Sequence, residues 1–265
     1  MNGEGQTFWE HLDVLRSMLI RIAVVTVLFA VVAFFFKEEM FSIILAPKEP
    51  EFITYRLLSH ISVFGSADDM STDFHVSLIN TGLAQQFIMH MQAAMSFGLL
   101  CASPFILYQL FRFVSPALYV EERRYAFTLV SSSYIMFIIG VLISYFLIFP
   151  FTFRFLGTYQ VSNDVENMIS ITSYMGTFIF MCLAMGIIFE MPVLTWLFAK
   201  FGFITSDFMR TYRKHAYVVI LIIAAVITPT ADAFTLILVS LPMILLYEVS
   251  IVIAGTVQNN SLTPP

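Results

Sequence analysis

The chain has 265 residues, of which 59% are hydrophobic and only 12% are charged, and its formal net charge is −5. A soluble domain carries roughly 25% charged residues, so this chain has too little charge to cover the surface of a soluble globular enzyme. So apolar a chain cannot stay disordered in water, and its net negative charge argues against a nucleic-acid partner, whose phosphates need clustered cations. The class that remains is a polytopic membrane protein.

Residues 1–16 precede the first long apolar run and have the pattern of an amphipathic helix. Trp9 and Leu12 lie on its apolar side, whereas Glu10 and Asp13 face water in this pattern. On pattern alone, the segment is an interfacial anchor.

Six apolar runs follow, and of all charged residues only Arg21, Glu190 and Glu248 lie inside them. A bilayer imposes this segregation, because a charge at its centre costs ~2.5–3.5 kcal/mol on insertion scales. Backbone groups in lipid must be hydrogen-bonded internally, so the runs are predicted to be transmembrane α-helices. They cover residues 17–36, 87–111, 126–149, 171–199, 215–229 and 233–254. The fifth run is short, since fifteen helical residues span only ~22 Å.

The first two runs are joined by residues 37–86, which are too many for a plain connector. Pro47, Pro50 and the polar stretch 66–73 predict an ordered cap that contains an irregular hairpin.

The loop 112–124 follows the second run and places Glu121 and Glu122 directly before Arg123 and Arg124. A carboxylate can accept both arms of a guanidinium group, a geometry that selects Arg over Lys. On composition alone, however, pairing among these four neighbours at a helix start explains the pattern better.

Glu190 lies near the middle of the fourth run, two residues before Pro192. An intramembrane carboxylate is a functional candidate by default, and the proline predicts a kink beside it. The alternative is a buried, neutral carboxyl group that only hydrogen-bonds a neighbouring helix.

Polar residues near the last two runs have structural and functional readings. Asp232 fits the N-cap of the sixth run, and a functional role is compatible with capping. Thr228 precedes the same turn, and Glu248 lies near the far end of the sixth run in a position typical of a structural residue.

His90, in the second run, fits a helix–helix hydrogen bond better than a pore lining.

Six spans place both termini on one side of the membrane. Eight basic residues lie on that side and four on the other, which predicts cytoplasmic termini by the positive-inside rule. The eight are Arg16, Arg112, Arg123, Arg124, Lys200, Arg210, Arg213 and Lys214.

The chain has no P-loop, no HExxH and no GxSxG motif, and its His, Cys and carboxylate residues have no metal-site spacing. We therefore expect no enzymatic activity, no cofactor and no metal.

An ordered series of motifs runs through nearly the whole chain. It comprises His11-Leu12 with Leu15-Arg16, Ala46-Pro47, residues 103–109 (SPFILYQ), residues 113–119 (FVSPALY) leading into Glu122-Arg123-Arg124, Phe149-Pro150, residues 189–192 (FEMP), residues 202–205 (GFIT), Thr228-Pro229 with Asp232, and Pro242-Met243. This series resembles the TatC family, the receptor subunit of the twin-arginine, Sec-independent protein translocase.

The resemblance implies an all-α membrane protein, a single domain over residues 1–265, with six transmembrane helices in a concave scaffold and a structured external cap. It implies a multi-pass protein of the bacterial cytoplasmic (inner) membrane that binds twin-arginine signal peptides. With single-span subunits of the TatA and TatB type, it would support transport of folded proteins driven by the proton-motive force. A homo-oligomer within a receptor complex is expected.

The family's functional residues fall on named positions of this chain. Those expected to bind the signal peptide are Glu122, Phe113, Arg123, Arg124, Glu10, Asp13 and Arg16. The intramembrane polar or partner contacts fall on Glu190, Asp232 and Thr228, and the cap proline falls on Pro47. The chain departs from the family at Val14, where many members carry Glu, and Glu10 or Asp13 would substitute there. The competing hypothesis is a proton-coupled small-solute transporter with Glu190 as the proton relay and His90 beside it.

Overall fold

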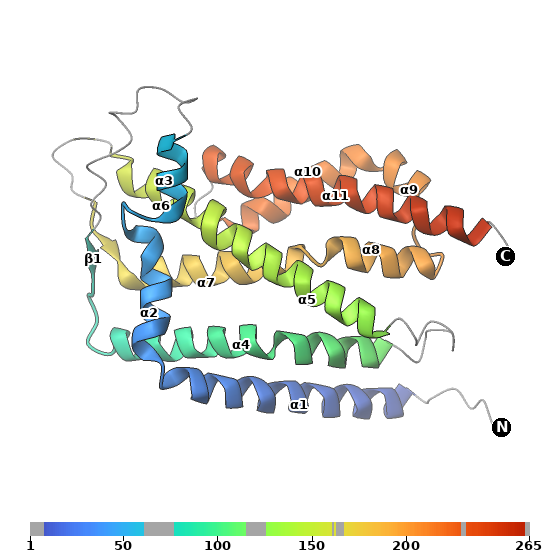
Figure 1. The fold of residues 1–265 in the computed structure, drawn as a ribbon, viewed down its shortest axis with the longest axis horizontal. Helices are drawn as coiled ribbons and strands as arrows, with labels where there is room; N and C mark the ends of the chain where they lie inside the picture. Colours follow the sequence, from blue (N-terminus) through green and yellow to red (C-terminus); the bar gives the residue numbers. More distant parts are fainter. Residues whose placement is uncertain are drawn as a thin grey trace. The chain divides into compact units, whose positions relative to one another are not determined.

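The computed structural model describes residues 8–60, 77–114, 126–160, 162, 167–228 and 232–262. Most of these residues are helical (Figure 1). In chain order the helices are α1 (Phe8–Phe34), α2 (Lys37–Leu45), the 3-10 turn η1 (Ala46–Lys48), α3 (Ile53–His60), α4 (Gln85–Val114), α5 (Ala126–Ile143), the π-turn η4 (Ser144–Ile148), α6 (Phe149–Thr158), α7 (Ile171–Ile188), α8 (Met191–Lys200), α9 (Ser206–Thr211), α10 (Arg213–Ile227) and α11 (Ala233–Leu262). Strands β1 (Leu78–Ile79) and β2 (Ile169–Ser170) pair in parallel.

Five stretches of described helix are long and apolar enough to cross a membrane. They cover residues 12–34, 85–113, 128–158, 171–200 and 233–258, and each contains most of one predicted run. The run predicted at 215–229 is α10, a helix of 15 residues (Arg213–Ile227), which is shorter than these five. The structure therefore supports five of the six predicted spans by length and composition, and the span predicted at 215–229 stays a prediction.

Two helices extend beyond the predicted runs. The described part of the amphipathic segment is continuous with the helix of the first run, because α1 runs without a break from Phe8 to Phe34. The third run does not end at Phe149, since the π-turn η4 leads directly into α6, which continues to Thr158. Pro150 lies in the first turn of α6, where its fixed φ fits the start of a helical segment. Its missing N–H leaves the carbonyl of Phe146 without a helical donor, and that carbonyl accepts from the hydroxyl group of Thr54.

By its internal contacts the chain divides into two compact units. One comprises residues 1–41 and 83–135, and the other comprises residues 42–82 and 136–265.

The first unit is built on the antiparallel pair α1 and α4 (Figure 1). Ala94, Gly98 and Ala102 recur every fourth residue on α4, and all three are buried. A Cβ added at Gly98 would lie 2.6 Å from the backbone nitrogen of Ala30, so the two helices touch through their backbones. Without a hydrophobic driving force between helices in lipid, such small residues allow the close packing that holds them together.

The second unit uses the same device where α5 meets α7. A Cβ added at Gly140 would lie 2.5 Å from the carbonyl oxygen of Met185, and one added at Gly186 would lie 2.7 Å from the ring of Phe137. Gly140 therefore lies against the backbone of α7, and Gly186 lies against the Phe137 ring of α5. Next to this contact, the rings of Phe149, Phe153, Tyr174 and Phe178 pack edge-to-face or stacked, with centroids 5.0–6.5 Å apart.

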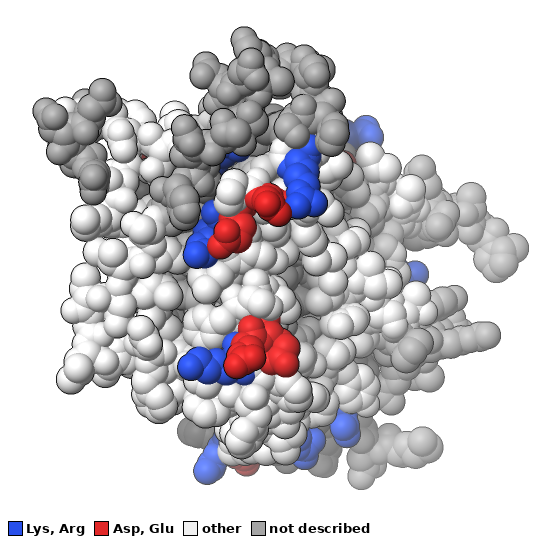
Figure 2. Space-filling view, turned by 60° about the vertical axis from the view of Figure 1, so that its left-hand side comes forward, with Lys and Arg blue, Asp and Glu red and all other residues white. Residues whose placement is uncertain are grey.

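The segment predicted to form an ordered cap, residues 37–86, is mostly helical up to residue 60 and contains strand β1 further along the chain. Residues 37–60 form α2, η1 and α3, and the polar stretch 66–73, where we expected a hairpin, lies outside the described residues. Ion pairs join Lys48 to Glu49 (3.3 Å) and Arg56 to Glu51 (3.0 Å). Figure 2 shows that charged side chains on one face of the molecule gather in small clusters of mixed sign on a largely uncharged surface.

Candidate functional site

The pairing of α1 with α4 brings together residues that are more than fifty positions apart in the sequence. Its register is given by two contacts, Ala30 on Gly98 and Phe34 on His90. At 1.5 Å per residue along both helices, this register places Phe113 level with residues 11–15 of α1. The start of α1 and the end of α4 therefore lie at the same end of the pair (Figure 1).

Three predicted signal-peptide residues, Glu10, Asp13 and Arg16, lie on that end of α1. Asp13 and Arg16 are exposed, and Phe113 on α4 is half-buried. Glu10 lies on α1 one turn before Val14, whose side chain is 45% exposed. The role of Glu10 in place of the family's usual glutamate stays a prediction.

The remaining predicted signal-peptide residues, Glu122, Arg123 and Arg124, lie outside the described part of the chain. The structure thus brings Asp13, Arg16 and Phe113 to one end of the α1–α4 pair, directly before the loop that holds the other three. Their roles in binding stay a prediction.

The predicted kink at Glu190 is confirmed. The helix ends at Ile188, and a new helix, α8, begins at Met191 with Pro192 in its first turn. Proline has no N–H to donate to the carbonyl of Ile188, which explains the interruption at this point. The side chain of Glu190 is only 9% exposed, so the carboxyl group lies inside the protein at the break.

The turn before α11 contains two further predicted residues. Asp232 is the N-cap of α11, since its Oδ1 accepts a hydrogen bond from the backbone N–H of Thr235 at 2.7 Å. Thr228 is buried at the end of α10, where its hydroxyl donates to the carbonyl of Ala225 at 3.3 Å. The capping role that the sequence predicted for Asp232 is therefore confirmed.

Pro47 is buried in η1 and is contacted by a tyrosine that the sequence did not single out. The hydroxyl group of Tyr55 lies 3.1 Å from the carbonyl oxygen of Pro47 and 2.9 Å from that of Pro150. The guanidinium carbon of Arg154 lies 5.3 Å from the centre of the Tyr55 ring. Burial raises the pKa of Tyr55 above its ordinary value, so the phenol stays neutral and can donate.

His90 is a helix–helix partner, as its position suggested. Its Nε2 atom donates to the carbonyl oxygen of Phe34 at 3.0 Å, and its ring stacks on the Phe34 ring with centroids 4.0 Å apart. The carbonyl belongs to the last turn of α1, where helical donors run out. These two contacts with Phe34 explain the position of His90 by helix packing.

Glu248 joins α10 to α11. Its Oε2 lies 2.9 Å from Nη2 of Arg213, and its Oε1 accepts a short hydrogen bond from the hydroxyl group of Tyr217. The sequence indicated a structural role for Glu248 but gave no sign of these partners, because they lie more than thirty residues away. Among the residues that the structure describes, no group of three or more His, Cys, Asp or Glu is placed to hold a metal ion.

Residues 10–242 match the family model described as Sec-independent protein translocase protein (TatC). The chain is 32% identical over 251 residues to the Sec-independent protein translocase protein TatC of Blattabacterium sp. subsp. Periplaneta americana, covering 93% of this chain and 94% of that protein. It is 31% identical over 245 residues to TatCy of Bacillus subtilis, covering 92% and 87% of the two chains.

Solved structures give the same family. The crystal structure of the twin-arginine translocase receptor TatC matches with a TM-score of 0.74 at 30% identity, over 94% of this chain and all of that one. A second crystal structure of that receptor, in DDM, matches with a TM-score of 0.76 at 30% identity, over 93% of this chain and all of that one. The chain therefore belongs to the TatC family of Sec-independent protein translocase proteins.

Proposed function

We propose that this protein is the subunit of a twin-arginine translocase that binds the signal peptides of folded cargo proteins. The observation that carries the proposal is the match to a twin-arginine translocase receptor at 30% identity across 94% of the chain. With single-span subunits of the TatA and TatB type, it transports folded proteins across the bacterial cytoplasmic membrane, driven by the proton-motive force. The matched relatives are protein translocases, which favours this function over a small-solute transporter.

The signal-peptide site lies at the end of the α1–α4 pair where Phe113 leads into the loop with Glu122. The carboxylate of Glu122 accepts the guanidinium groups of the two arginines, and Phe113 packs beside them. Asp13, and Glu10 in place of the family's glutamate at Val14, add negative charge at the same end of α1. Arg16, Arg123 and Arg124 orient these carboxylates. This geometry selects arginine over lysine, because only a guanidinium group binds a carboxylate with two parallel hydrogen bonds.

Both termini lie in the cytoplasm in this proposal, and α10 is the fifth of six spans. A helix of 15 residues crosses a bilayer only where the bilayer thins or where neighbouring helices cover its ends. The excess of basic residues on the side of the termini supports the orientation. The helices 37–60 then belong to an external cap, with Pro47 at its turn.

Glu190 meets polar groups of the single-span partners or of the inserted signal peptide. Its burial at the α7–α8 break supports this role, because a break exposes backbone polar groups beside a carboxyl group in an apolar helix. Asp232 and Thr228, at the α10–α11 turn, supply further polar contacts. Full export and full partner crosslinking in a Glu190→Ala variant would show that its role is packing only.

The test of the receptor site uses a photo-crosslinker at Phe113 and signal peptides that carry either Arg-Arg or Lys-Lys. We expect crosslinks with the Arg-Arg peptide that disappear in Glu122→Gln and persist in Glu121→Gln, a matched change at the neighbouring residue. Export of a twin-arginine reporter should be lost only in Glu122→Gln, with normal membrane insertion of both variants. Equal crosslinks with both peptides, or normal export by Glu122→Gln, would refute the assignment.

A further inference from the structure

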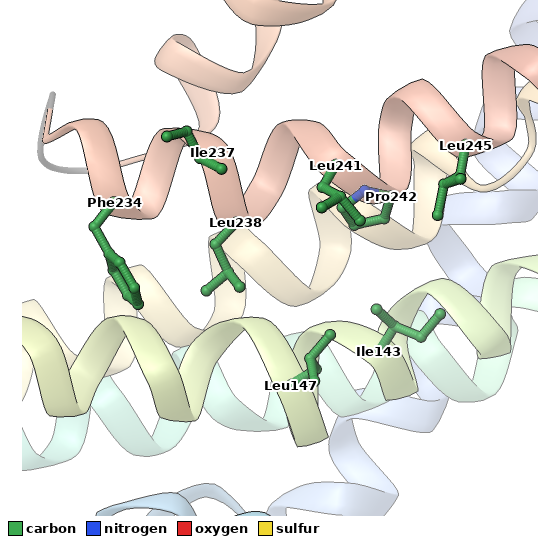
Figure 3. A pocket seen from close by; sticks show the side chains of 8 residues that line it. All are labelled: Ile143, Leu147, Phe234, Ile237, Leu238, Leu241, Pro242 and Leu245. Carbon is green, nitrogen blue, oxygen red and sulfur yellow. The ribbon is translucent and has the colours of Figure 1, made fainter. Parts of the chain in front are cut away.

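An apolar groove of about 360 Å³ lies between α11 and the end of α5 with η4 (Figure 3). It opens on the surface of the molecule, since Leu147, Ile237, Leu241 and Leu245 are all 43–60% exposed. In Figure 3, Phe234 and Leu238 point from α11 toward the helix that carries Leu147 and Ile143. The lining residues are Ile143, Leu147, Phe234, Ile237, Leu238, Leu241, Pro242 and Leu245.

The shape of the groove fits an acyl chain better than a helix. Its wall on α11 extends from Phe234 to Leu245, which is ~16 Å at 1.5 Å per residue. A helix ~10 Å wide fills ~120 Å³ per residue, so this groove could enclose only about three residues of one. An acyl chain is much thinner than a helix, so it can lie inside a groove of this size. An extended acyl chain advances ~1.2 Å per bond, so a stretch of about twelve methylenes is ~14 Å long and matches the wall.

The two ends of the groove differ in chemistry. At one end the ring of Phe234 stacks on Phe155, with centroids 4.5 Å apart. Beyond the other end, Glu248 lies one turn past Leu245 on the same helix face and is paired with Arg213.

The cation at that end is available to an anionic headgroup. Side chains of a helix lean toward its N-terminus, so the Glu248 carboxylate and the guanidinium group on it lean back toward Leu245. The side chain of Arg213 is 44% exposed, and its Nη2 contact with Glu248 uses one of the five N–H groups of a guanidinium. Arg210 and Lys214, both exposed, add positive charge within three residues of Arg213.

We propose that this groove binds one acyl chain of an anionic glycerophospholipid, with the lipid phosphate at Arg213. The chain lies along Leu245, Leu241 and Leu238 and ends at Phe234. This lipid is a specific ligand of the protein, unlike the bulk lipid that covers the other apolar faces. It occupies the gap that α5 and α11 leave between them, and so it contributes to the packing of the second unit.

Native mass spectrometry of the full chain in mild detergent tests the proposal, with phosphatidylglycerol or phosphatidylcholine added. We expect one retained phosphatidylglycerol and little phosphatidylcholine. Leu241→Trp fills part of the groove, so it should lower retention about tenfold, since each methylene displaced from an apolar site is worth roughly fourfold. Val252→Trp, on the same helix but outside the lining, is the matched control and should retain the lipid.

The headgroup contact has its own pair of variants. Arg213→Gln should lower retention of phosphatidylglycerol about fivefold, because one cation near the headgroups is worth about that much. Tyr217→Phe also disturbs the Glu248 cluster but keeps its charges, and it should retain the lipid. Equal retention in Arg213→Gln and the wild type would overturn the proposal, as would equal retention of the two lipids.

Photo-crosslinking in native membranes distinguishes the occupants. A crosslinker at Leu241 should yield adducts with the mass of an anionic phospholipid. A crosslinker at Val252 should show no preference for anionic phospholipids. Adducts from Leu241 to a single-span subunit or to a second copy of the chain, in place of lipid, would refute the acyl-chain site.

Discussion

The contact of Gly98 with Ala30 makes a sharp prediction about the α1–α4 pair. A Cβ at residue 98 would lie 2.6, 2.7 and 2.8 Å from the N, Cα and Cβ atoms of Ala30. Carbon atoms pack at ~3.5–4.0 Å, so the two helices must separate by about 1 Å to admit even an alanine. Because the obstacle is backbone, no side chain can move aside. Overpacking of this kind costs about 1–3 kcal/mol.

The matched control is Gly176 on α7, where an added Cβ meets nothing within 4 Å. Both Gly→Ala changes gain up to ~1 kcal/mol of helix propensity, so the difference between the two variants isolates the steric cost. At roughly 2–4 °C per kcal/mol, Gly98→Ala should melt about 2–12 °C below Gly176→Ala. Thermal unfolding of the purified proteins in one detergent, followed by circular dichroism, measures this difference.

The same substitution should weaken signal-peptide binding, because it moves Phe113 away from Asp13 and Arg16. The affinity of the purified protein for a fluorescent twin-arginine peptide should fall in Gly98→Ala and stay unchanged in Gly176→Ala. Identical melting temperatures for the two variants would show that the close approach of α1 and α4 does not contribute to stability, and the reasoning would fail.

Three further predictions concern polar contacts. Asp232→Ala should destabilise the protein by about 0.5–2 kcal/mol through loss of the N-cap, whereas Asp232→Asn keeps the cap; loss of export in the stable Asn variant would show that the charge itself is required. His90→Phe keeps the ring on Phe34 but removes the hydrogen bond, so it should cost about 1 kcal/mol in thermal unfolding and leave export intact; a stable variant without export would support a proton relay. Burial raises the pKa of Tyr55, so the stability that this phenol contributes is present below pH 10 and is lost as the pH rises further; Tyr55→Phe should reduce the slope of that loss in chemical unfolding, and an unchanged slope would contradict it.

Features of this fold that depend on one residue and its chain neighbours were predictable. Pro192 lacks an N–H and interrupts its helix, and Asp232 accepts from an N–H three residues later. The sequence around Pro150 did not show that the helix continues, because proline occurs both after the end of a helix and in its first turn. Helix α6 extends nine residues past the end of the third predicted run, Phe149.

Contacts between distant segments could not be predicted, because apolar periodicity shows that a helix is buried but not against which partner. Tyr217 and Arg213 meet Glu248 only in the antiparallel register of α10 and α11. Likewise, nothing in the sequence near Phe113 indicates that Asp13 lies beside it along the axis of the helix pair. That register depends on the contact between Gly98 and Ala30. The candidate site was therefore predicted as a set of residues, whereas their arrangement required the structure.

The prolines of this chain explain several of those unpredicted contacts. In an α-helix, the amide of each residue donates to the carbonyl four residues before it, and a proline leaves that carbonyl without its donor. In an apolar environment the lost bond is costly unless a hydroxyl group or another donor replaces it. For three prolines, residues 47, 104 and 150, a hydroxyl group donates to that same carbonyl. For Pro47, the carbonyl of Ile43 accepts from the hydroxyl group of Tyr145 at 2.9 Å. For Pro104, the carbonyl of Leu100 accepts from Ser103 at 2.7 Å, and for Pro150 the carbonyl of Phe146 accepts from Thr54.

These replacements differ in range, and the difference has a structural consequence. Ser103 acts within its own helix, so Pro104 is accommodated without any tertiary contact. The donors for Pro47 and Pro150 lie about a hundred residues away in the chain. Tyr145 of η4 donates to the carbonyl of Ile43 in α2, and Thr54 of α3 donates to the carbonyl of Phe146 in η4. Each of these two prolines is therefore tolerated only when the helices at 42–60 are packed on η4 and α6. The hydroxyl group of Tyr55, between the carbonyls of Pro47 and Pro150, lies where the two meet. Pro47 thus couples the folding of the predicted cap to its packing on η4 and α6.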